Sequence, residues 1–299
     1  MSGAKRTRRT KAQMQAIREG IVDLAQDHQP CTVRQIYYLG IGRYWDKDTG
    51  RSRKHYDTVV RYAGDLREAG DLPGGWIADN TRWVRQDTMY YSAADALDRW
   101  AESYRRDLWA AQPRRVEVWC ESDSIAGVID RVTRPSGVGL FVARGQASKT
   151  FVYEAVQSYR HIGKPVSIIY VGDWDPSGLA IPLSVEERIQ RYGDDDLDLE
   201  FERIAVTASD VASGDLIGHS ANMRDSNYRR FADHCRVMGL DPQTAVEVEA
   251  IPPERLRQRV RDALDVLAGD VDAWNATIAA ERSEREIFQR MAESFGGAA

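Results

Sequence analysis

The chain has 299 residues, enough for two modest domains, and its composition of 42% hydrophobic and 29% charged residues is typical of a globular protein. It contains no run of eighteen apolar residues, and no apolar stretch follows its basic N-terminus, so we expect neither a membrane span nor a secretory signal. Cys31, Cys120 and Cys235 are far apart and show no zinc spacing, which predicts free thiols in a reducing cytoplasm.

The net charge of −5 is unevenly distributed along the chain. Residues 1–85 contain 16 Lys or Arg and 10 Asp or Glu, whereas the remaining residues contain 25 and 36, respectively. A basic first part is suited to phosphate, and an acidic second part is suited to cations. The alternative is that such asymmetry arises by chance, as it does in many globular proteins.

Three helices are predicted in the basic part. Apolar residues at three- and four-residue steps predict a helix over 12–27. Thr32 is a good N-cap for a second helix over 33–45. A third helix is predicted over 54–69, with Gly70 as its stop.

The next segment, DLPGGWIADNTRWVRQ (71–86), places Pro-Gly-Gly turn signals between short apolar stretches, which predicts a β-hairpin. Three helices followed by such a wing predict a winged helix-turn-helix DNA-binding domain over 1–90, with a basic arm over 1–11. The candidate DNA-contacting residues are Arg8, Arg9, Arg43, Lys54, Arg61 and Lys149.

The periodicity changes beyond a linking helix predicted over 91–112. Short β-rich runs alternate with helical stretches, a pattern that predicts an α/β domain with a mostly parallel sheet over 113–250. The predicted strands are 116–120, 139–143, 166–172 and 199–206, and the predicted helices are 123–133, 149–160 and 179–192. Two amphipathic helices are predicted over 251–299, and VEVEA (246–250) before them is a candidate edge strand.

Acidic residues directly follow two of the predicted strands. Glu121 follows the strand VEVWC, and Asp173 and Asp175 follow VSIIYVG within GDWDPSG. The carboxyl ends of parallel strands are where open α/β sheets bind ligands, and residues i and i+2 of an extended segment point the same way. Three carboxylates predict a Mg²⁺ site able to act on a phosphodiester; the alternative is three surface acids on turns.

The order of these motifs, a Glu after one strand and an Asp-x-Asp about fifty residues later, resembles the Toprim domain. The wording GDWDPSG and the intervening ARGQASKTFVYEA resemble the A subunit of topoisomerase VI and the related meiotic break-forming proteins. The resemblance covers roughly residues 30–180. It implies a winged helix joined to a Toprim domain, double-stranded DNA as substrate, and a homodimer in which the metal site of one subunit serves the tyrosine of the other.

A possible nucleophile lies in the second predicted helix. Arg34 is four residues before Tyr38, so both side chains occupy one helical face, where a guanidinium can hold a phosphate beside the phenol. The pattern T-x-R-x-x-Y-Y also resembles the catalytic helix of the topoisomerase VI A subunit, which implies that Tyr38 attacks DNA and makes Tyr38, Arg34 and Glu121 the candidate catalytic residues. The alternative is that both tyrosines pack or contact phosphate, and we expect Tyr37 to be a packing residue.

The chain is shorter than a typical topoisomerase VI A subunit, and its sequence begins almost at the winged helix. An ATPase B-type partner is therefore not supported, and the chain looks more like compact orphan relatives of bacteria and phages. Three functions remain open: a DNA-cleaving transesterase of the cytoplasm and nucleoid, a Toprim nuclease that uses water, and a non-catalytic DNA-binding module. Intact Glu121, Asp173 and Asp175 argue against the third, because clustered carboxylates repel DNA unless a cation neutralises them.

Overall fold

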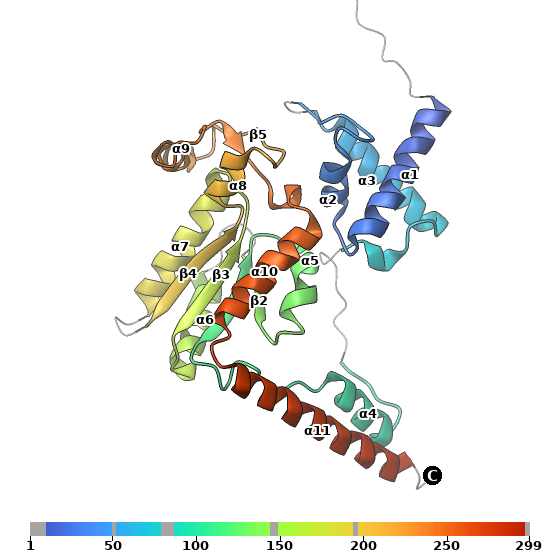
Figure 1. The fold of residues 1–299 in the computed structure, drawn as a ribbon, viewed down its shortest axis with the longest axis vertical. Coiled ribbons are helices and arrows are strands. Elements are labelled where there is room, and N and C mark those ends of the chain that lie inside the picture. The colour runs from blue at the N-terminus through green and yellow to red at the C-terminus, as the bar shows by residue number, and fades with distance from the viewer. Residues whose placement is uncertain (1–9, 50–51, 79–86, 144–148, 194–196, 297–299) are drawn as a thin grey trace, which may run out of the picture.

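The computed structural model describes residues 10–49, 52–78, 87–143, 149–193 and 197–296. Within these ranges the chain is an α/β protein with N-terminal helices, a four-stranded parallel sheet with interleaved helices, and C-terminal helices (Figure 1). None of the described helices has both the length and the apolar character that crossing a bilayer requires.

The three predicted N-terminal helices are confirmed as α1 (Lys11–His28), α2 (Val33–Gly40) and α3 (Lys54–Ala69). Each of the first two helices begins with a capping box. In it, a threonine hydroxyl and a glutamine side-chain oxygen each accept a hydrogen bond from the other residue's backbone N–H. The helices share one apolar core, whose fully buried members include Ile21, Ile36 and Val59. This core explains why short helices are stable here, since packing contributes more than propensity.

The second helix is shorter than predicted, because α2 ends at Gly40 and not near residue 45. The chain turns back there, and Ile41 forms a bridge with Trp45. The Trp45 ring lies against Gly40 so closely that a side chain at that position would collide with it, and its indole N–H donates to the Tyr37 carbonyl oxygen. The tryptophan therefore stops the helix by covering its last turn.

Half of the predicted wing, residues 79–86, lies outside the described residues. The described part of that segment holds a short 3-10 helix, η1 (Gly74–Trp76), and Ile77, which pairs with Cys31 in an isolated bridge. The backbone N–H of Ala78 donates to the Cys31 carbonyl oxygen at 3.0 Å, so the segment returns alongside the start of α2.

The predicted parallel sheet is confirmed. Its strands are β1 (Arg115–Cys120), β2 (Gly139–Val142), β3 (Val166–Val171) and β4 (Leu199–Ala205), and all three pairings in the order β2-β1-β3-β4 are parallel. The register places Cys120 opposite Val171, so β1 and β3 end side by side at the centre of the sheet. Residues that follow these two strands are therefore neighbours.

Helices cover both faces of this sheet. On one face, α5 (Asp123–Thr133) and α10 (Pro253–Leu267) pack over the side chains of Val118 and Ile169. On the other face, α6 (Lys149–Ile162) and α7 (Pro176–Tyr192) pack over Trp119. Because both faces of the sheet are covered, the central strand β3 (VSIIYV) is a nearly continuous hydrophobic run, whereas the edge strand β4 (LEFERIA) alternates apolar and charged residues.

The region between the sheet and α10 is built from short elements that the sequence did not reveal. They are α8 (Ala208–Ser213), β5 (His219–Ser220), α9 (Tyr228–Val237), β6 (Thr244–Ala245) and the 3-10 helix η2 (Val248–Ala250). The predicted edge strand over 246–250 is wrong, because only Val246 pairs, in a bridge with Trp174, before the chain turns into η2. That bridge holds η2 beside the loop that follows β3.

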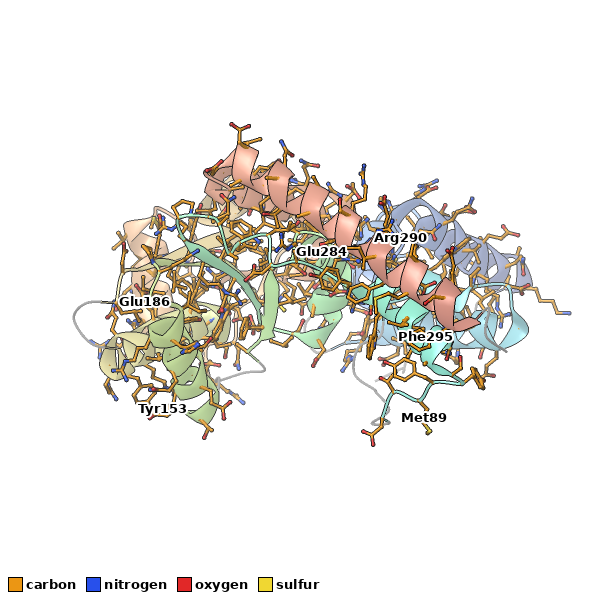
Figure 2. The ribbon with its side chains drawn as sticks, turned by 90° about the horizontal axis from the view of Figure 1, so that it is seen from below. Met89, Tyr153, Glu186, Glu284, Arg290 and Phe295 are labelled. Carbon is orange, nitrogen blue, oxygen red and sulfur yellow. The ribbon has the colours of Figure 1, made fainter. Side chains whose placement is uncertain are left out.

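The predicted linking helix is shorter than expected: α4 covers Ala93–Ser103, and an irregular segment leads from it to β1. α4 packs along α11 (Val271–Gly296), and the pair stands apart from the sheet (Figure 1). The Tyr104 hydroxyl donates to Glu284 at 2.6 Å, which ties the end of α4 to the middle of α11, where Figure 2 labels Glu284. The two predicted C-terminal helices are confirmed as α10 and α11.

Candidate functional site

The structure brings two of the three predicted metal ligands into contact. Glu121 follows β1 and Asp173 follows β3, and the Asp173 backbone N–H donates to Glu121 Oε2 at 3.0 Å. The Asp173 carboxylate in turn accepts the Val248 N–H at 2.8 Å through Oδ1. The carboxyl ends of β1 and β3 and the start of η2 thus meet at one point.

The third acid, Asp175, is the N-cap of α7. Its Oδ1 accepts the Gly178 N–H at 2.6 Å, a common role for aspartate at a helix start. Gly178 lies against the Asp173 carbonyl oxygen so closely that a β-carbon there would collide with it. The Pro-Ser-Gly that follows Asp175 therefore shapes the loop that carries both aspartates.

Two further charged residues, Glu249 and Arg203, lie near the three acids, and neither was predicted. Glu249, in η2, is buried and accepts the Ser124 hydroxyl at 2.9 Å. Arg203, on β4, donates to the carbonyl oxygens of Gly172 at 2.9 Å and Asp173 at 3.1 Å. Its guanidinium holds the loop after β3 in place and supplies positive charge beneath the acids.

Glu121 and Asp173 resist ionisation. Burial raises the pKa of Glu121 to about 7, and the negative charges of Asp175 and Glu249 add to the rise, while the hydrogen bond from the Asp173 N–H and the charge of Arg203 oppose it. Burial and the neighbouring Glu121 and Glu249 also raise the pKa of Asp173 well above its ordinary value. A cation bound here would relieve this repulsion.

The donor chemistry fits Mg²⁺, although the acids do not form a closed cage. Within the described ranges, no three His, Cys, Asp or Glu side chains converge tightly enough to hold an ion by themselves. Mg²⁺ does not require that, because it keeps several waters and is commonly bound by one or two carboxylates together with substrate phosphate. Glu121 and Asp173 are the carboxylates placed to hold it, with Asp175 beside them.

The raised pKa of Glu121 predicts a pH-dependent response to Mg²⁺. The folded-state pKa of about 7 lies above the ordinary value of 4.5, so Glu121 lowers the stability of the metal-free protein as pH rises between these values. We expect Mg²⁺ to raise the melting temperature more at about pH 8 than at about pH 5.5, because the carboxylate must be ionised to bind the ion. Thermal unfolding with and without Mg²⁺ measures this. In Glu121→Gln the difference between the two pH values should shrink, and an equal Mg²⁺ effect at both pH values in the unaltered chain would contradict the prediction.

A second group of residues surrounds Tyr38 in a cleft of about 850 Å³. The cleft lies between α2, the start of α3 and the β5–η2 region, which Figure 1 shows facing one another. Its basic and aromatic lining residues are Arg34, Tyr37, Tyr38, Lys47, Arg53, Tyr56 and His219. Asp48, Asp241 and Glu247 also line it, so the described lining holds three carboxylates beside three Lys or Arg side chains. The arginine, lysine and aromatic side chains are of the kind that contact the phosphates and bases of a nucleic acid.

Tyr38 and Arg34 both bind one carboxylate of the other half of the chain. The Tyr38 hydroxyl donates to Glu247 Oε2 at 2.8 Å, and Arg34 Nε lies 2.7 Å from the same oxygen. Burial and the charge of Glu247 raise the pKa of Tyr38 far above the ordinary value, and Arg34 only partly opposes this. The phenol is therefore held neutral, with its proton directed at Glu247.

Tyr37 is a packing residue, as the sequence predicted. Its ring is buried and makes edge contacts with the rings of Tyr38 and Tyr56 at centroid distances of 5.4 Å. Its hydroxyl accepts the Asp48 backbone N–H at 2.9 Å. Asp48 in turn accepts the N–H groups of His55 and Tyr56, so this contact fixes the loop that leads into α3.

The tyrosine and the acids are linked within one chain. Glu247 binds Tyr38, and the next residue, Val248, donates its N–H to Asp173. The resemblance to topoisomerase VI implied a tyrosine acting at the metal site of a partner subunit. In this structure α2 contacts η2 of its own chain, and the first residue of η2, Val248, donates its N–H to Asp173 of the same chain.

The predicted DNA contacts are only partly described. Arg43, Lys54 and Arg61 are exposed on or near the N-terminal helices, and the guanidinium groups of Arg43 and Arg61 lie over neighbouring tyrosine rings. Arg8 and Arg9 lie outside the described residues, as does the side chain of Lys149 at the start of α6. Lys47 and Arg53 of the cleft were not predicted as DNA contacts, although both lie in the loop before α3.

Glu247 and Arg203 were also missed, since each acts on residues far away in the chain. The only local signal for Glu247 was the acid-rich segment VEVEA (246–250), which was predicted as a candidate edge strand. The chain matches no protein-family model and no curated protein.

Proposed function

We propose that this chain is a Mg²⁺-dependent DNA-cleaving enzyme similar to the topoisomerase VI A subunit, in which Tyr38 attacks a phosphodiester and becomes joined to DNA. The observation that carries the proposal is the shared contact of Tyr38 and Arg34 with Glu247, whose neighbour Val248 donates its N–H to the Asp173 carboxylate. The candidate nucleophile, a guanidinium able to bind phosphate and a candidate metal ligand thus contact the same short segment.

The arrangement of elements supports the finer fold assignment. Helices α1–α3 with a following return segment are consistent with a winged-helix DNA-binding domain. A parallel sheet with acids after its two central strands is consistent with a Toprim domain. In this proposal double-stranded DNA lies across the N-terminal helices, and a second copy of the chain makes the cut in the opposite strand.

The chain's own residues then have distinct tasks. Arg34, half-exposed at the cleft, binds the scissile phosphate through its guanidinium. Tyr38 supplies the attacking oxygen, and the fixed ring of Tyr37 orients it. Glu121 and Asp173 hold Mg²⁺, which when bound stabilises negative charge on the reacting phosphate.

A second candidate, a Toprim-type nuclease that uses water, is favoured by one observation. The phenol of Tyr38 is largely buried and donates to a carboxylate, and its pKa is raised and not lowered. A tyrosine in that state is a poor nucleophile unless a base removes its proton. In the nuclease, Tyr38 would only contact DNA, and water would attack the phosphate.

An end-labelled duplex distinguishes the two functions. The protein is incubated with the duplex and Mg²⁺, the reaction is stopped with detergent, and the label is followed on a denaturing gel. The proposal expects a DNA 5′ end that migrates with the protein and is released by protease. Free ends that require Mg²⁺ would identify the water-dependent nuclease, and intact DNA would overturn both.

A further inference from the structure

We propose that Glu247 is the general base that takes the proton of Tyr38 during DNA cleavage. This inference rests on the proposed function and adds a catalytic residue to it. The inference starts from the hydrogen bond between Tyr38 in α2 and Glu247 directly before η2, which are 209 positions apart in the sequence.

The geometry needed for proton transfer is already present. The Tyr38 hydroxyl points at Glu247 Oε2 across 2.8 Å, within the range in which a base abstracts a proton. The Glu247 side chain is 17% exposed, so it is held in the wall of the cleft and still reaches solvent. Among the described residues, Glu247 is the one acceptor to which the Tyr38 hydroxyl donates.

Arg34 connects Glu247 to the DNA substrate. Its Nε lies 2.7 Å from the same Glu247 oxygen. A scissile phosphate that enters the cleft competes with Glu247 for the guanidinium, because phosphate binds arginine in the same bidentate way as a carboxylate. When Arg34 turns to the phosphate, Glu247 Oε2 still accepts the Tyr38 hydroxyl, beside the bound phosphate.

The step balances as follows. The Tyr38 oxygen forms a bond to phosphorus while the bond from phosphorus to the 3′ oxygen breaks, and the phenolic proton passes to Glu247. The 3′ oxygen leaves with the bonding electron pair and takes up a proton from water. Glu247 then releases its proton to the solvent of the cleft, and no net acid or base is formed.

The test replaces Glu247 with glutamine, which keeps the side-chain shape and can still accept the Tyr38 hydrogen bond but cannot take the proton. We expect the rate of protein–DNA adduct formation to fall about a hundredfold or more, the usual contribution of a general base. Asp215→Asn is the matched control, since Asp215 is exposed between β4 and η2 but does not line the cleft, and this substitution also removes one negative charge. Its rate should stay near that of the unaltered chain.

A more acidic tyrosine separates proton transfer from positioning. Incorporation of a fluorinated tyrosine at position 38 makes the phenol easier to ionise, so it should recover much of the rate that Glu247→Gln loses. DNA affinity measured without Mg²⁺ and the melting temperature show that the variant binds and folds.

An unchanged or faster Glu247→Gln overturns the inference, and a faster one shows that the carboxylate only competes with phosphate for Arg34. A slow variant that fluorination does not recover also overturns it, because the role is then positional. In both cases the unaltered chain still forms the adduct, so the proposed function stands. Absence of any adduct in the unaltered chain overturns the proposed function and this inference with it.

Discussion

Replacing Tyr38 with phenylalanine should abolish the covalent protein–DNA product. The substitution removes one oxygen atom, the one proposed to attack phosphorus, and leaves the ring contact with Tyr37 in place. A missing nucleophile cannot be replaced by positioning alone, so we expect adduct formation to fall by a factor of about 10⁴ or more. The loss is measured with a duplex labelled at its 3′ ends, as label that no longer migrates with the protein.

Tyr56→Phe provides the matched control for this change. Tyr56 lines the same cleft from α3 and also contacts Tyr37, so the variant loses an equivalent hydroxyl from the same surface. It should retain adduct formation within a few-fold of the unaltered chain. Equal loss in both variants would mean that the cleft needs its tyrosines for DNA binding only, and cleavage that persists in Tyr38→Phe would identify water as the nucleophile.

The change at Tyr38 should also affect stability slightly and in a defined direction. In the unaltered chain the phenol satisfies Glu247, which otherwise relies on Arg34 and the more distant His219. Loss of one hydrogen bond to a charged group costs about 1.5–3 kcal/mol when the partner is fully buried, and less here because Glu247 reaches solvent. A fold that remains intact with a modestly lower melting temperature therefore separates lost chemistry from lost structure.

The parts of the fold that the sequence predicted well are those with local causes. The Thr32 cap, the αL conformation of Gly70 at φ 82° and the alternation of apolar runs are each specified by a few neighbouring residues. The placement of acids after β1 and β3 follows from parallel pairing, which makes Glu121 and Asp173 neighbours once the sheet is known. These features could be predicted because none of them depends on a contact between distant parts of the chain.

The missed parts depend on contacts between distant segments. The second helix was predicted too long because Trp45 ends it by folding back, a tertiary effect that helical periodicity does not encode. The elements between β4 and α10 are mostly too short to carry a periodic signal. Glu247 is an acid in an unremarkable alternating segment, and only the docking of α2 against η2 gives it Tyr38 and Arg34 as partners.

Replacing Asp173 with asparagine should remove cleavage and stabilise the metal-free protein at the same time. The Asp173 carboxylate is largely withdrawn from water and lies beside Glu121 and Glu249, so keeping it ionised at about pH 8 costs free energy. Asparagine retains an oxygen that can accept the Val248 N–H, so the support of η2 is kept. We expect the unfolding free energy without Mg²⁺ to rise by about 1 kcal/mol or more.

The same substitution removes a proposed Mg²⁺ ligand, so the stabilisation by Mg²⁺ should disappear and DNA cleavage should fall below detection, whether tyrosine or water attacks. Melting curves with and without Mg²⁺ and the end-label assay measure both effects on one preparation. Glu202→Gln, which makes the same kind of change at an exposed position of β4, should leave both unchanged. A variant that is more stable without Mg²⁺ but still cleaves would show that these acids repel one another for a reason other than metal binding. If Asp173→Asn instead lowered stability, the carboxylate would be held by contacts that outweigh the repulsion, and the site would be a structural one.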